Sequence, residues 1–497
     1  MASYIGIDLG TTFSAVAYID ETGRPKIINN DRGDNVTPSC VALKGGKLIV
    51  GEVARKEWGN APDQAAARFK RDMGTSTVHT INDVELSPTE LSAEVLRSLK
   101  VTAENEVGNI TEAVVTIPAN FAHEAREATM EAANQAGLTV KYIINEPTAA
   151  ALYYAFENGN DLHGHYVVYD LGGGTFDVSV IKVDGQDIDV VSSNGLAKLG
   201  GDDFDRAIWN LVADKYHSEC GKDLDPEDFP INDAEQEKIS LSGRKRSTAQ
   251  IGRDLIDLSR LELEEAFSSF IAQTEMLCES TVDEADIEMS DIKGVYLAGG
   301  STRIPLVAES VEKVFGQKPI ASGNVDEVVA LGAALYAAFK SDKSDLTTVQ
   351  KQSIGKIKVA ESTSMCFGTI AVLVNEERNT EELGNSILIH KGERIPVSVS
   401  KAFFTAHQGQ TSVNCRITES RSAETDPKFV KIIWEGDLDL PEGRDRGQEI
   451  QISYSYDENQ VMSAKFLDVA SGQETKIDMS LGSQEGTGSA IDKFIVE

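Results

Sequence analysis

Two stretches far apart in the chain share one order of apolar and polar positions. In residues 4–17 an apolar run ends at Asp8, a turn of glycine and threonine follows, and a second, largely alternating run begins. Residues 167–180 repeat this order around Asp170. Alternation with a period of two is typical of a half-buried β-strand. Each stretch therefore predicts two strands joined by a glycine turn, and the repeat predicts a duplicated domain.

Apolar residues at every fourth position predict helices elsewhere in the first 340 residues. Ser87 opens a Ser-Pro-Thr-Glu sequence, which is the pattern of a helix capping box, and leucine and valine follow it four residues apart. A second capping box begins at Ser259. The acidic segment 202–285 is expected to be mostly helical. The small residues of 326–334 predict a helix that packs tightly on a sheet.

The pattern changes near residue 360, where short alternating segments replace the helical ones. A polar stretch before this point predicts a linker. We therefore expect a first domain over 1–342, a linker over 343–362, a β-sandwich over 363–481 and a Gly/Ser-rich flexible tail over 482–497. The strands expected in the sandwich are 386–389, 397–400, 412–417, 430–434 and 450–456.

Charge and cysteine usage narrow the possible partners and the compartment. The formal net charge is −33, from 80 acidic and 47 basic residues, so we expect neither nucleic acid nor an anionic membrane as a partner. The five cysteines are scattered and form no Cys-x-x-Cys pair, which argues against a zinc site. No secretory leader is expected before the first strand, and scattered thiols fit a reducing compartment, so the predicted location is cytoplasmic.

Glycine turns that follow an aspartate predict a phosphate site that includes a metal ion. Glycine has no Cβ, so backbone N–H groups can approach an anion closely. Asp8 and Asp170 would repel a phosphate unless a cation lay between them. Two facing turns of this kind would hold one nucleotide between two lobes. For either copy alone, a glycine-rich hairpin turn without a ligand is the alternative.

Three further features allow both a functional and a structural interpretation. Glu146 precedes a proline-initiated helix, where a carboxylate either caps the helix or positions a metal ion or water. The basic run 68–74 is either a solvated surface or a neighbour of the phosphates. The sequence from 294 to 305 predicts a strand, a double glycine and a helix, a geometry that suits close approach of backbone to a flat or anionic ligand.

These motifs together resemble those of the Hsp70 chaperone family. Residues 6–14 resemble its first phosphate motif, 170–179 its second, and 297–305 its adenosine motif. Residues 144–151 and 199–205 are similar to Hsp70 proteins rather than to actin or sugar kinases. The resemblance implies an α/β actin-like ATPase domain, duplicated on a ribonuclease-H-like plan, followed by an all-β sandwich domain that binds substrate.

The resemblance also implies roles for individual residues. Asp8 and Asp170 would hold the hydrated Mg²⁺ of bound ATP, with the help of Glu146. Lys70 would lie near the γ-phosphate and the attacking water, and Thr175 would line the same site. These five residues are the predicted catalytic set. Contacts with the nucleotide are implied for Gly10, Thr11, Thr12, Gly172, Gly173, Gly174, Gly200, Gly201, Glu235, Lys238, Ser242, Gly299, Gly300, Ser301, Arg303, Ile304 and Asp326.

The implied function is that of an ATP-dependent molecular chaperone with slow ATP hydrolysis. ATP or ADP and Mg²⁺ are the implied cofactors, with K⁺ as a further candidate ion. Unfolded or extended polypeptides are the implied partners, together with a J-domain co-chaperone and a nucleotide exchange factor. An ATP-switched co-chaperone or scaffold with one dedicated partner is the alternative. A small-molecule kinase on the same fold is a third, less favoured interpretation.

Several positions differ from the family pattern. Ile239 replaces an arginine that stacks on adenine, which is expected to weaken nucleotide binding. Lys358 interrupts the apolar linker motif, and Tyr142 replaces an arginine that contacts J-domains. Phe403 and Val413 match residues of the peptide pocket, whereas Asn385 replaces an apolar residue that arches over it. No helical lid is expected after residue 481.

Overall fold

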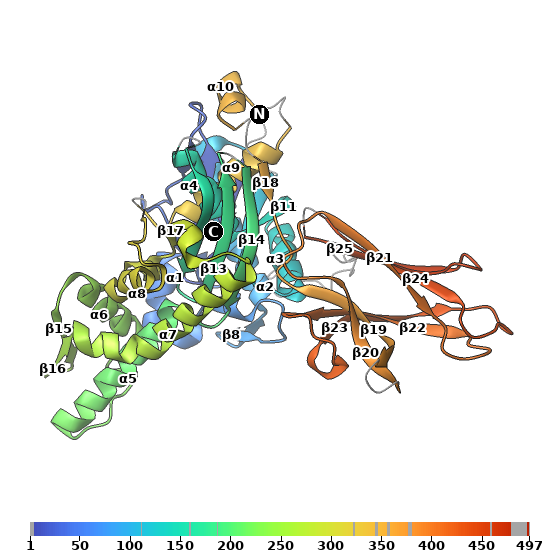
Figure 1. The fold of residues 1–497 in the computed structure, drawn as a ribbon. Coiled ribbons are helices and arrows are strands. Elements are labelled where there is room, and N and C mark those ends of the chain that lie inside the picture. Colours follow the sequence, from blue (N-terminus) through green and yellow to red (C-terminus); the bar gives the residue numbers. More distant parts are fainter. Residues whose placement is uncertain are drawn as a thin grey trace. The chain divides into compact units, whose positions relative to one another are not determined.

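The computed structural model of the chain describes residues 4–496 except 111, 159–160, 186, 322–323, 343–345, 355–357, 376–379, 458–459 and 479–494. It divides into two compact units, Met1–Val359 with Gly486–Glu497 and Ala360–Glu485. The first unit is a mixed α/β structure and the second is built from strands (Figure 1). Among the described helices, none is both long and apolar enough to cross a membrane.

The first unit contains two central sheets with the same arrangement at their centres. Strand β1 is antiparallel to β2 and parallel to β10, and β12 is likewise antiparallel to β13 and parallel to β17. The two repeated sequence patterns thus form equivalent strand pairs. The first sheet contains β11 (Thr139–Asn145), β10 (Glu112–Ile117), β1 (Tyr4–Asp8), β2 (Phe13–Ile19) and β3 (Pro25–Ile27), and β4 (Thr37–Pro38) pairs with β2. The second contains β17 (Ile292–Ala298), β12 (His163–Leu171), β13 (Phe176–Asp184), β14 (Asp187–Leu196) and β18 (Lys358–Ala360).

Two helices rich in small residues, α4 (Glu146–Glu157) and α9 (Val328–Lys340), pack against each other and against these sheets. Their approach is too close for side chains at two glycines. A Cβ at Gly332 would lie 1.7 Å from the carbonyl oxygen of Ala149, and a Cβ at Gly6 would lie 2.1 Å from the nitrogen of Ala334. The predicted tight packing of 326–334 is therefore confirmed. It fixes the ends of β1 and α4, where Asp8 and Glu146 stand.

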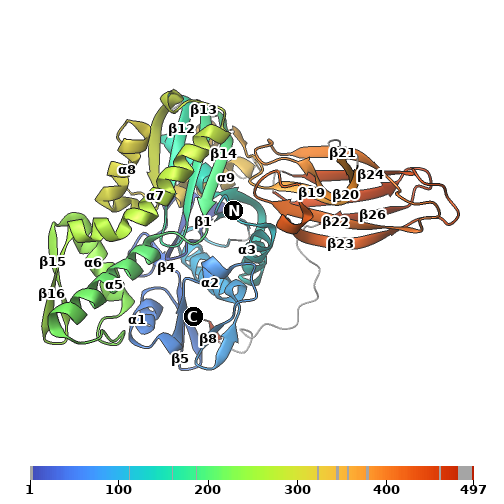
Figure 2. The same cartoon turned by 60° about the horizontal axis from the view of Figure 1, so that its bottom comes forward.

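We call the part built on the β1 sheet lobe I and the part built on the β12 sheet lobe II. Both predicted capping boxes are present, at Ser87 and at Ser259. In Figure 2, α1 of lobe I and α5 of lobe II lie close to each other. Lobe I also has α1 (Glu52–Asn60), α2 (Pro88–Val107), α3 (His123–Gln135), the sheet β27 (Ile495–Val496), β6 (Lys47–Val50), β5 (Cys40–Lys44) and β7 (Ala65–Ala67), and the hairpin β8 (His79–Ile81) and β9 (Val84–Leu86). Lobe II also has α5 (Gly201–Cys220), α6 (Ile231–Gly243), α7 (Arg260–Glu284) and α8 (Pro305–Phe315).

The segment 202–285 is mostly helical, as predicted, but it also contains a hairpin that the prediction missed. Strands β15 (Arg246–Ile251) and β16 (Asp254–Ser259) pair there in antiparallel fashion. Buried and exposed side chains alternate along both strands. Gly252 supplies the turn, with a φ of +59°. The sequence of this segment alternates with a period of two, but the acidic composition of the surrounding residues favoured the helical prediction.

The stretch predicted as a linker contains regular structure where it is described. Helix α10 (Thr348–Ile354) packs on the first unit through a buried Ile354. Gln350 donates to the carbonyl oxygens of Ile19 and Asp20, and Ser353 donates to that of Gly23. Because these contacts hold 348–354 on lobe I, this part of the predicted linker is not a free connection. Strand β18 adds residues 358–360 to the edge of the lobe II sheet.

The second unit consists of two four-stranded antiparallel sheets. Four of the five predicted strands lie within longer ones, and the fifth, 430–434, overlaps the strand Lys431–Asp439 from its second residue onward. Tyr454 and Phe466 are fully buried between the sheets. Of the predicted tail, 482–494 and 497 lie outside the described residues, so the expectation that no helical lid follows residue 481 stays a prediction. One sheet contains β20 (Thr380–Ile389), β19 (Cys366–Asn375), β22 (Ser412–Ser420) and β23 (Lys431–Asp439), and the other contains β21 (Val397–Phe404), β24 (Glu449–Tyr456), β25 (Met462–Asp468) and β26 (Glu474–Asp478).

Candidate functional site

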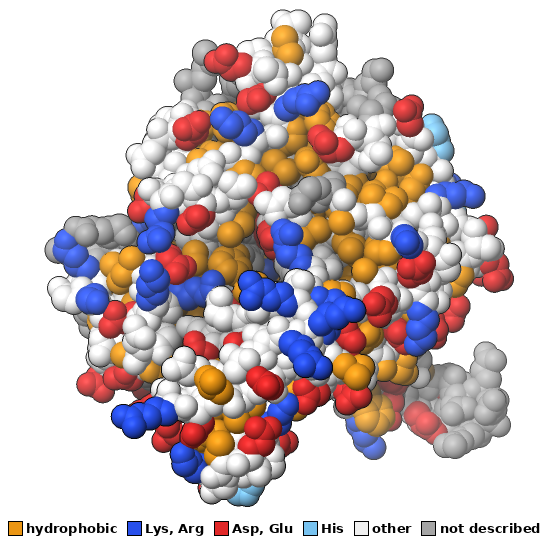
Figure 3. Space-filling model, turned by 90° about the vertical axis from the view of Figure 1, so that its left-hand side faces the viewer, with side chains coloured by type: hydrophobic (Ala, Val, Ile, Leu, Met, Phe, Trp, Pro, Cys, Tyr) orange, Lys and Arg blue, Asp and Glu red, His pale blue; other side chains and the backbone are white. Residues whose placement is uncertain are grey.

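A cavity of about 370 Å³ lies between the two lobes, where the equivalent strand pairs meet. Its walls come from the β1–β2 turn, the β12–β13 turn, the first turn of α5, helix α6 and the loop after β17. Figure 3 views the side that carries α5, α6 and α8, and Lys and Arg side chains gather across the middle of this face. This local positive charge would favour an anionic ligand, although the whole chain carries a formal net charge of −33.

The two glycine turns face each other across this cavity without room for further side chains. A Cβ at Gly173 would lie 1.7 Å from Oγ1 of Thr12, and a Cβ at Gly174 would lie 2.4 Å from Cγ2 of Thr11. Oγ1 of Thr12 is buried and has no hydrogen-bond partner among the described residues. Such a hydroxyl is costly unless a ligand satisfies it. The cradle and the free hydroxyl both fit a phosphate group.

The first turn of α5 supports the second glycine turn from behind. The N–H of Gly201 donates to the carbonyl oxygen of Gly172 at 3.0 Å, and that of Asp202 donates to the carbonyl oxygen of Gly173 at 2.8 Å. A Cβ at Gly200 would lie 2.6 Å from the nitrogen of Gly174. Gly200 is therefore needed because two backbones meet there.

Four charged side chains lie at the closed end of the cavity. Nζ of Lys70 lies 2.6 Å from Oε1 of Glu146, and both side chains are buried. Asp8 accepts a hydrogen bond from Oγ1 of Thr116 at 2.9 Å. Asp170 is also buried and lines the same cavity. The basic run 68–74 is thus more than a solvated surface, because its lysine is enclosed beside a carboxylate.

Burial makes ionisation of these carboxylates costly. Burial, followed by the charge of Glu146, raises the pKa of Asp8 to about 7. The same two causes, in the same order, raise the pKa of Asp170 and that of Asp177 well above their usual range. Lys70 opposes the shift in all three groups. One lysine does not balance these acids when they are ionised, and a bound cation would favour their ionised form.

The donor set fits a hydrated divalent cation rather than one bound directly by three side chains. Carboxylate oxygens are the ligands that Mg²⁺ prefers, and Mg²⁺ usually keeps several of its waters. Among the described residues, no three His, Cys, Asp or Glu side chains are grouped closely enough to hold a metal ion. Asp8, Asp170 and Glu146 could therefore hold Mg²⁺ through water, and their metal-binding role stays a prediction.

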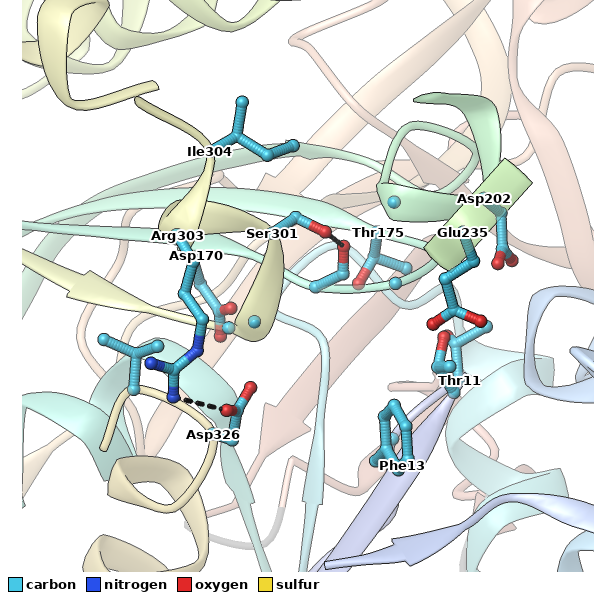
Figure 4. Close-up of a pocket in the computed structure, with 18 of the residues that line it drawn as sticks. Thr11, Phe13, Asp170, Thr175, Asp202, Glu235, Ser301, Arg303, Ile304 and Asp326 are labelled. Atoms are coloured by element: carbon cyan, nitrogen blue, oxygen red, sulfur yellow. Dashed lines mark hydrogen bonds and ion pairs between the residues drawn. The ribbon is translucent and has the colours of Figure 1, made fainter. Parts of the chain in front are cut away.

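The open end of the cavity has the features expected for a nucleoside. Ser301 donates to the carbonyl oxygen of Gly172 at 2.8 Å, which ties the β17 loop to the glycine turn (Figure 4). Arg303 contacts Asp326 at 2.7 Å (Figure 4). This ion pair holds a flat guanidinium at the cavity wall. Ile239 lines the cavity, and 56% of its surface is exposed, so a base could contact it.

Hydrogen-bonding groups from helix α6 complete this end. Nζ of Lys238 lies 2.6 Å from Asp205 and donates to the carbonyl oxygen of Gly201 at 3.0 Å. Ser242 donates back to the carbonyl oxygen of Lys238 within its own helix. Glu235 is paired with Arg55 of lobe I. Lys238, Ser242 and Glu235 were assigned from the family resemblance alone, and Asp205 was not predicted.

Nearly all predicted site residues are brought together in this one cavity. Gly174 and Gly200 do not line it, and they shape the turn instead, as their close contacts show. Asp202 and Asp205 were missed, although their place in the first turn after Gly200 could have indicated that they face the ligand. Further lining residues that the sequence did not indicate are Phe13, Val325 and Val329. The roles assigned to the predicted residues stay predictions.

In the second unit, the side-chain amide of Asn385 is hydrogen bonded at both its nitrogen and its oxygen. Asn385 is buried, its amide nitrogen donates to the carbonyl oxygen of Glu424 at 2.7 Å, and its amide oxygen accepts from Oγ1 of Thr418 at 2.6 Å. The side chain therefore ties the segment after β22 to the β20 edge. Phe403 is partly buried on β21 and lies near Lys401, whose Nζ is 5.9 Å from the ring centre.

The structure defines a class of protein. Its members have a mixed α/β unit with two facing glycine turns around one charged cavity, and an all-β unit follows. The family model described as Hsp70 protein matches this chain in two overlapping segments, residues 4–85 and 76–497. The chain therefore belongs to the Hsp70 family. Members of this family are ATPases that use ATP or ADP with Mg²⁺, and the chain is a chaperone of the Hsp70 type.

Proposed function

We propose that the protein binds ATP with Mg²⁺ in the cavity between the lobes and hydrolyses it slowly. The observation that carries this proposal is the buried contact of 2.6 Å between Lys70 and Glu146, beside Asp8 and Asp170 and below the two glycine turns. Transfer of a phosphoryl group to water requires positioning and neutralisation of charge more than covalent chemistry. The cavity offers both.

Several residues around the cavity would have separate roles in binding and hydrolysis. Backbone N–H groups of the two turns and the free hydroxyl of Thr12 would bind phosphate oxygens. Lys70 would place its charge beside the transferred group and orient the attacking water, and Thr175 would approach the same phosphate. Bound Mg²⁺ would supply further neutralisation of the phosphate charge. A positioned network of water molecules would serve as the base, so turnover is expected to be slow.

The second unit would bind extended segments of other proteins. Phe403 and Val413 match the peptide-pocket residues of the family, and both are partly buried. On the hairpin of β19 and β20, the directly opposite side chains of Val372 and Leu383 are exposed. Exposed apolar side chains on a strand pair suit apolar peptides. The cytoplasm is the proposed compartment, because the cysteines are free.

A dedicated scaffold is the second candidate, and the environment of Asn385 favours it. An amide that is fully engaged with Thr418 and Glu424 holds the segment after β22 in place. A fixed segment is less able to adapt to many sequences than a mobile one. In this candidate, ATP would still bind between the lobes, and the β unit would recognise one protein partner.

The ATPase rate with and without a short apolar peptide tests the proposal and separates the candidates. The chaperone predicts Mg²⁺-dependent hydrolysis that an unrelated apolar peptide accelerates. The scaffold predicts no acceleration by such peptides and selective capture of one partner in pull-downs. A protein that neither binds nor hydrolyses ATP would contradict both.

A further inference from the structure

Arg68 makes a connection between the lobes that the proposed function does not use. It lies between β7 and the short helical turn Phe69–Asp72 of lobe I, with a left-handed φ of 65°. Its guanidinium carbon lies 4.7 Å from the ring centre of Trp58 in α1. A non-glycine residue in this conformation is uncommon and needs surrounding contacts to hold it. The stacking on Trp58 supplies one such contact on the side of lobe I.

The other contacts of Arg68 are with lobe II. Its Nε lies 2.7 Å from Oδ1 of Asp202, and its Nη2 lies 3.8 Å from Oδ2 of Asp205. Both carboxylates belong to the first turns of α5, and each is only 2% exposed. Arg71 lies farther from Asp202, at 3.8 Å, and pairs mainly with Asp203 at 2.6 Å. Arg68 is therefore the nearest cation to Asp202 from across the cleft.

These carboxylates also belong to the wall of the nucleotide cavity. Asp202 and Asp205 line it, and the N–H of Asp202 holds the second glycine turn. Asp205 is shared with Lys238 of α6, at 2.6 Å. A continuous chain of contacts thus runs from Trp58 through Arg68 and the two acids to the groups expected to bind phosphate and adenosine.

Separation of the lobes would widen the cavity, and it must break the contacts of Arg68 with Asp202 and Asp205. A buried ion pair resists separation because each charge would be left without its partner. Other pairs also cross the cleft, including Arg55 with Glu235. Glu235 belongs to α6, whereas the N–H of Asp202 holds the glycine turn. Arg71 reaches this turn as well, by donating to the carbonyl oxygen of Gly174 at 3.0 Å.

We propose that Arg68 is a positioning residue that holds lobe I against the first turn of α5 and thereby sets the rate of nucleotide release. The inference rests on the proposed function, since it assumes that the cavity holds a nucleotide. It assigns no role in bond cleavage to Arg68. The residue acts on the nucleotide through Asp202 and the glycine turn.

The test measures dissociation of a fluorescent ADP analogue from the full chain by stopped flow. Arg68→Ala should release the nucleotide at least about tenfold faster than the unchanged protein, and Arg68→Lys should give an intermediate rate. Asp202→Asn should also accelerate release. Because both single changes break the same contact, the double variant should be little faster than Arg68→Ala. Arg32→Ala is the matched control, since Arg32 is exposed and pairs only with Asp34 of the same lobe among the described ion pairs.

Three results would overturn the inference. The first is a release rate for Arg68→Ala within twofold of the unchanged protein. The second is a double variant whose acceleration equals the product of the two single effects, which would show independent actions. The third is an equal acceleration in Arg32→Ala. If Arg68→Ala fails to fold, Arg68→Lys carries the test. Failure of the unchanged protein to bind the analogue would instead contradict the proposed function.

Discussion

Lys70 and Glu146 come from different parts of lobe I and meet at 2.6 Å in a buried position beside Asp8 and Asp170. Lys70 stands in a short helical turn, and Glu146 is the first residue of α4. The pair places one positive charge among several acids at the closed end of the cavity. Chemistry at a phosphate is expected to depend on this charge.

Replacement of Lys70 should separate binding from hydrolysis. Lys70→Ala is expected to lower the ATPase rate by about a hundredfold or more, because it removes the charge beside the transferred group. Nucleotide affinity should change by less than about tenfold, since the glycine turns remain. Isothermal titration and steady-state hydrolysis measure the two effects. Lys26→Ala, which changes an exposed lysine of lobe I, is the control and should leave both unchanged. Equal losses of binding and hydrolysis would contradict this assignment.

A cation restored at position 239 should tighten nucleotide binding. Ile239 lines the open end of the cavity and is 56% exposed, so Ile239→Arg can be accommodated without disturbing the core. A guanidinium over an aromatic base contributes about 0.5–2 kcal/mol, which corresponds to roughly 2- to 30-fold in affinity. Ile239→Leu is the matched control. Titration of ADP into both variants measures the effect, and unchanged or weaker binding to the arginine variant would show that the base lies elsewhere.

The close approach of α4 and α9 predicts a large effect of one methyl group. Gly332→Ala would place a Cβ 1.7 Å from the carbonyl oxygen of Ala149, and we expect it to lower the free energy of unfolding by about 3 kcal/mol. Gly243→Ala is the control, since nothing lies within 4 Å of a Cβ there and its φ is not positive. Urea unfolding followed by circular dichroism measures both. Equal stability of the two variants would show that α9 can shift away from α4.

The buried acid Asp205 predicts a pH dependence of stability. Burial raises its pKa from 3.8 to about 6, although Lys238 opposes the shift. A carboxyl with a higher pKa in the folded state holds its proton more tightly there. Burial of Asp205 therefore does not lower the free energy of unfolding below about pH 4. It lowers this free energy increasingly as the pH rises through about 6. The free energy of unfolding of Asp205→Asn, relative to that of the unchanged protein, should therefore rise by about 1–3 kcal/mol between pH 4 and pH 7.5.

Thermal or urea unfolding of both proteins at the two pH values checks this difference. The comparison between proteins is needed because many other groups titrate in the same range. A difference in stability that is the same at both pH values would mean that Asp205 titrates normally in the folded protein. If Asp205→Asn is less stable than the unchanged protein by a larger amount at pH 7.5 than at pH 4, the attraction of Lys238 and Arg68 for the Asp205 carboxylate outweighs the cost of its burial.

In the second unit, Asn385 should matter for stability and for partner choice. Asn385→Ala removes the hydrogen bonds to Thr418 and Glu424 and leaves their polar groups buried, which is expected to cost about 2–3 kcal/mol. If the segment after β22 selects one partner, the variant should also bind unrelated apolar peptides more readily. Urea unfolding and fluorescence anisotropy with a labelled peptide measure the two effects. Tighter folding of the variant would contradict the structural role.

The features that sequence predicted well depend on neighbours in the chain. Each of these features is encoded by a few consecutive residues: the strand that ends at Asp8, the glycine turn after it and the capping box at Ser87. The structure contains all of them. The gathering of Lys70 and Glu146 at one site followed only from the family resemblance. Local pattern cannot show which distant turns will meet.

The features that sequence missed depend on contacts between distant segments. The sequence did not show that Asn385 would contact Thr418 and Glu424, which come from another part of the sandwich. Arg68 appeared only as one member of a basic run, because Asp202 lies more than a hundred residues away along the chain. The fold determines which of these distant side chains pair, and their burial determines how much each pair contributes to stability.

Single-turnover hydrolysis of ATP measures whether the cavity between the lobes is an ATPase site. The full chain is mixed with radiolabelled ATP and Mg²⁺ under conditions where protein exceeds nucleotide, beside Lys70→Ala and Thr175→Ala. We expect slow release of phosphate by the unchanged protein, no release without Mg²⁺, and a rate at least about a hundredfold lower in both variants. Hydrolysis that persists in both variants, or no hydrolysis by the unchanged protein, would contradict this expectation.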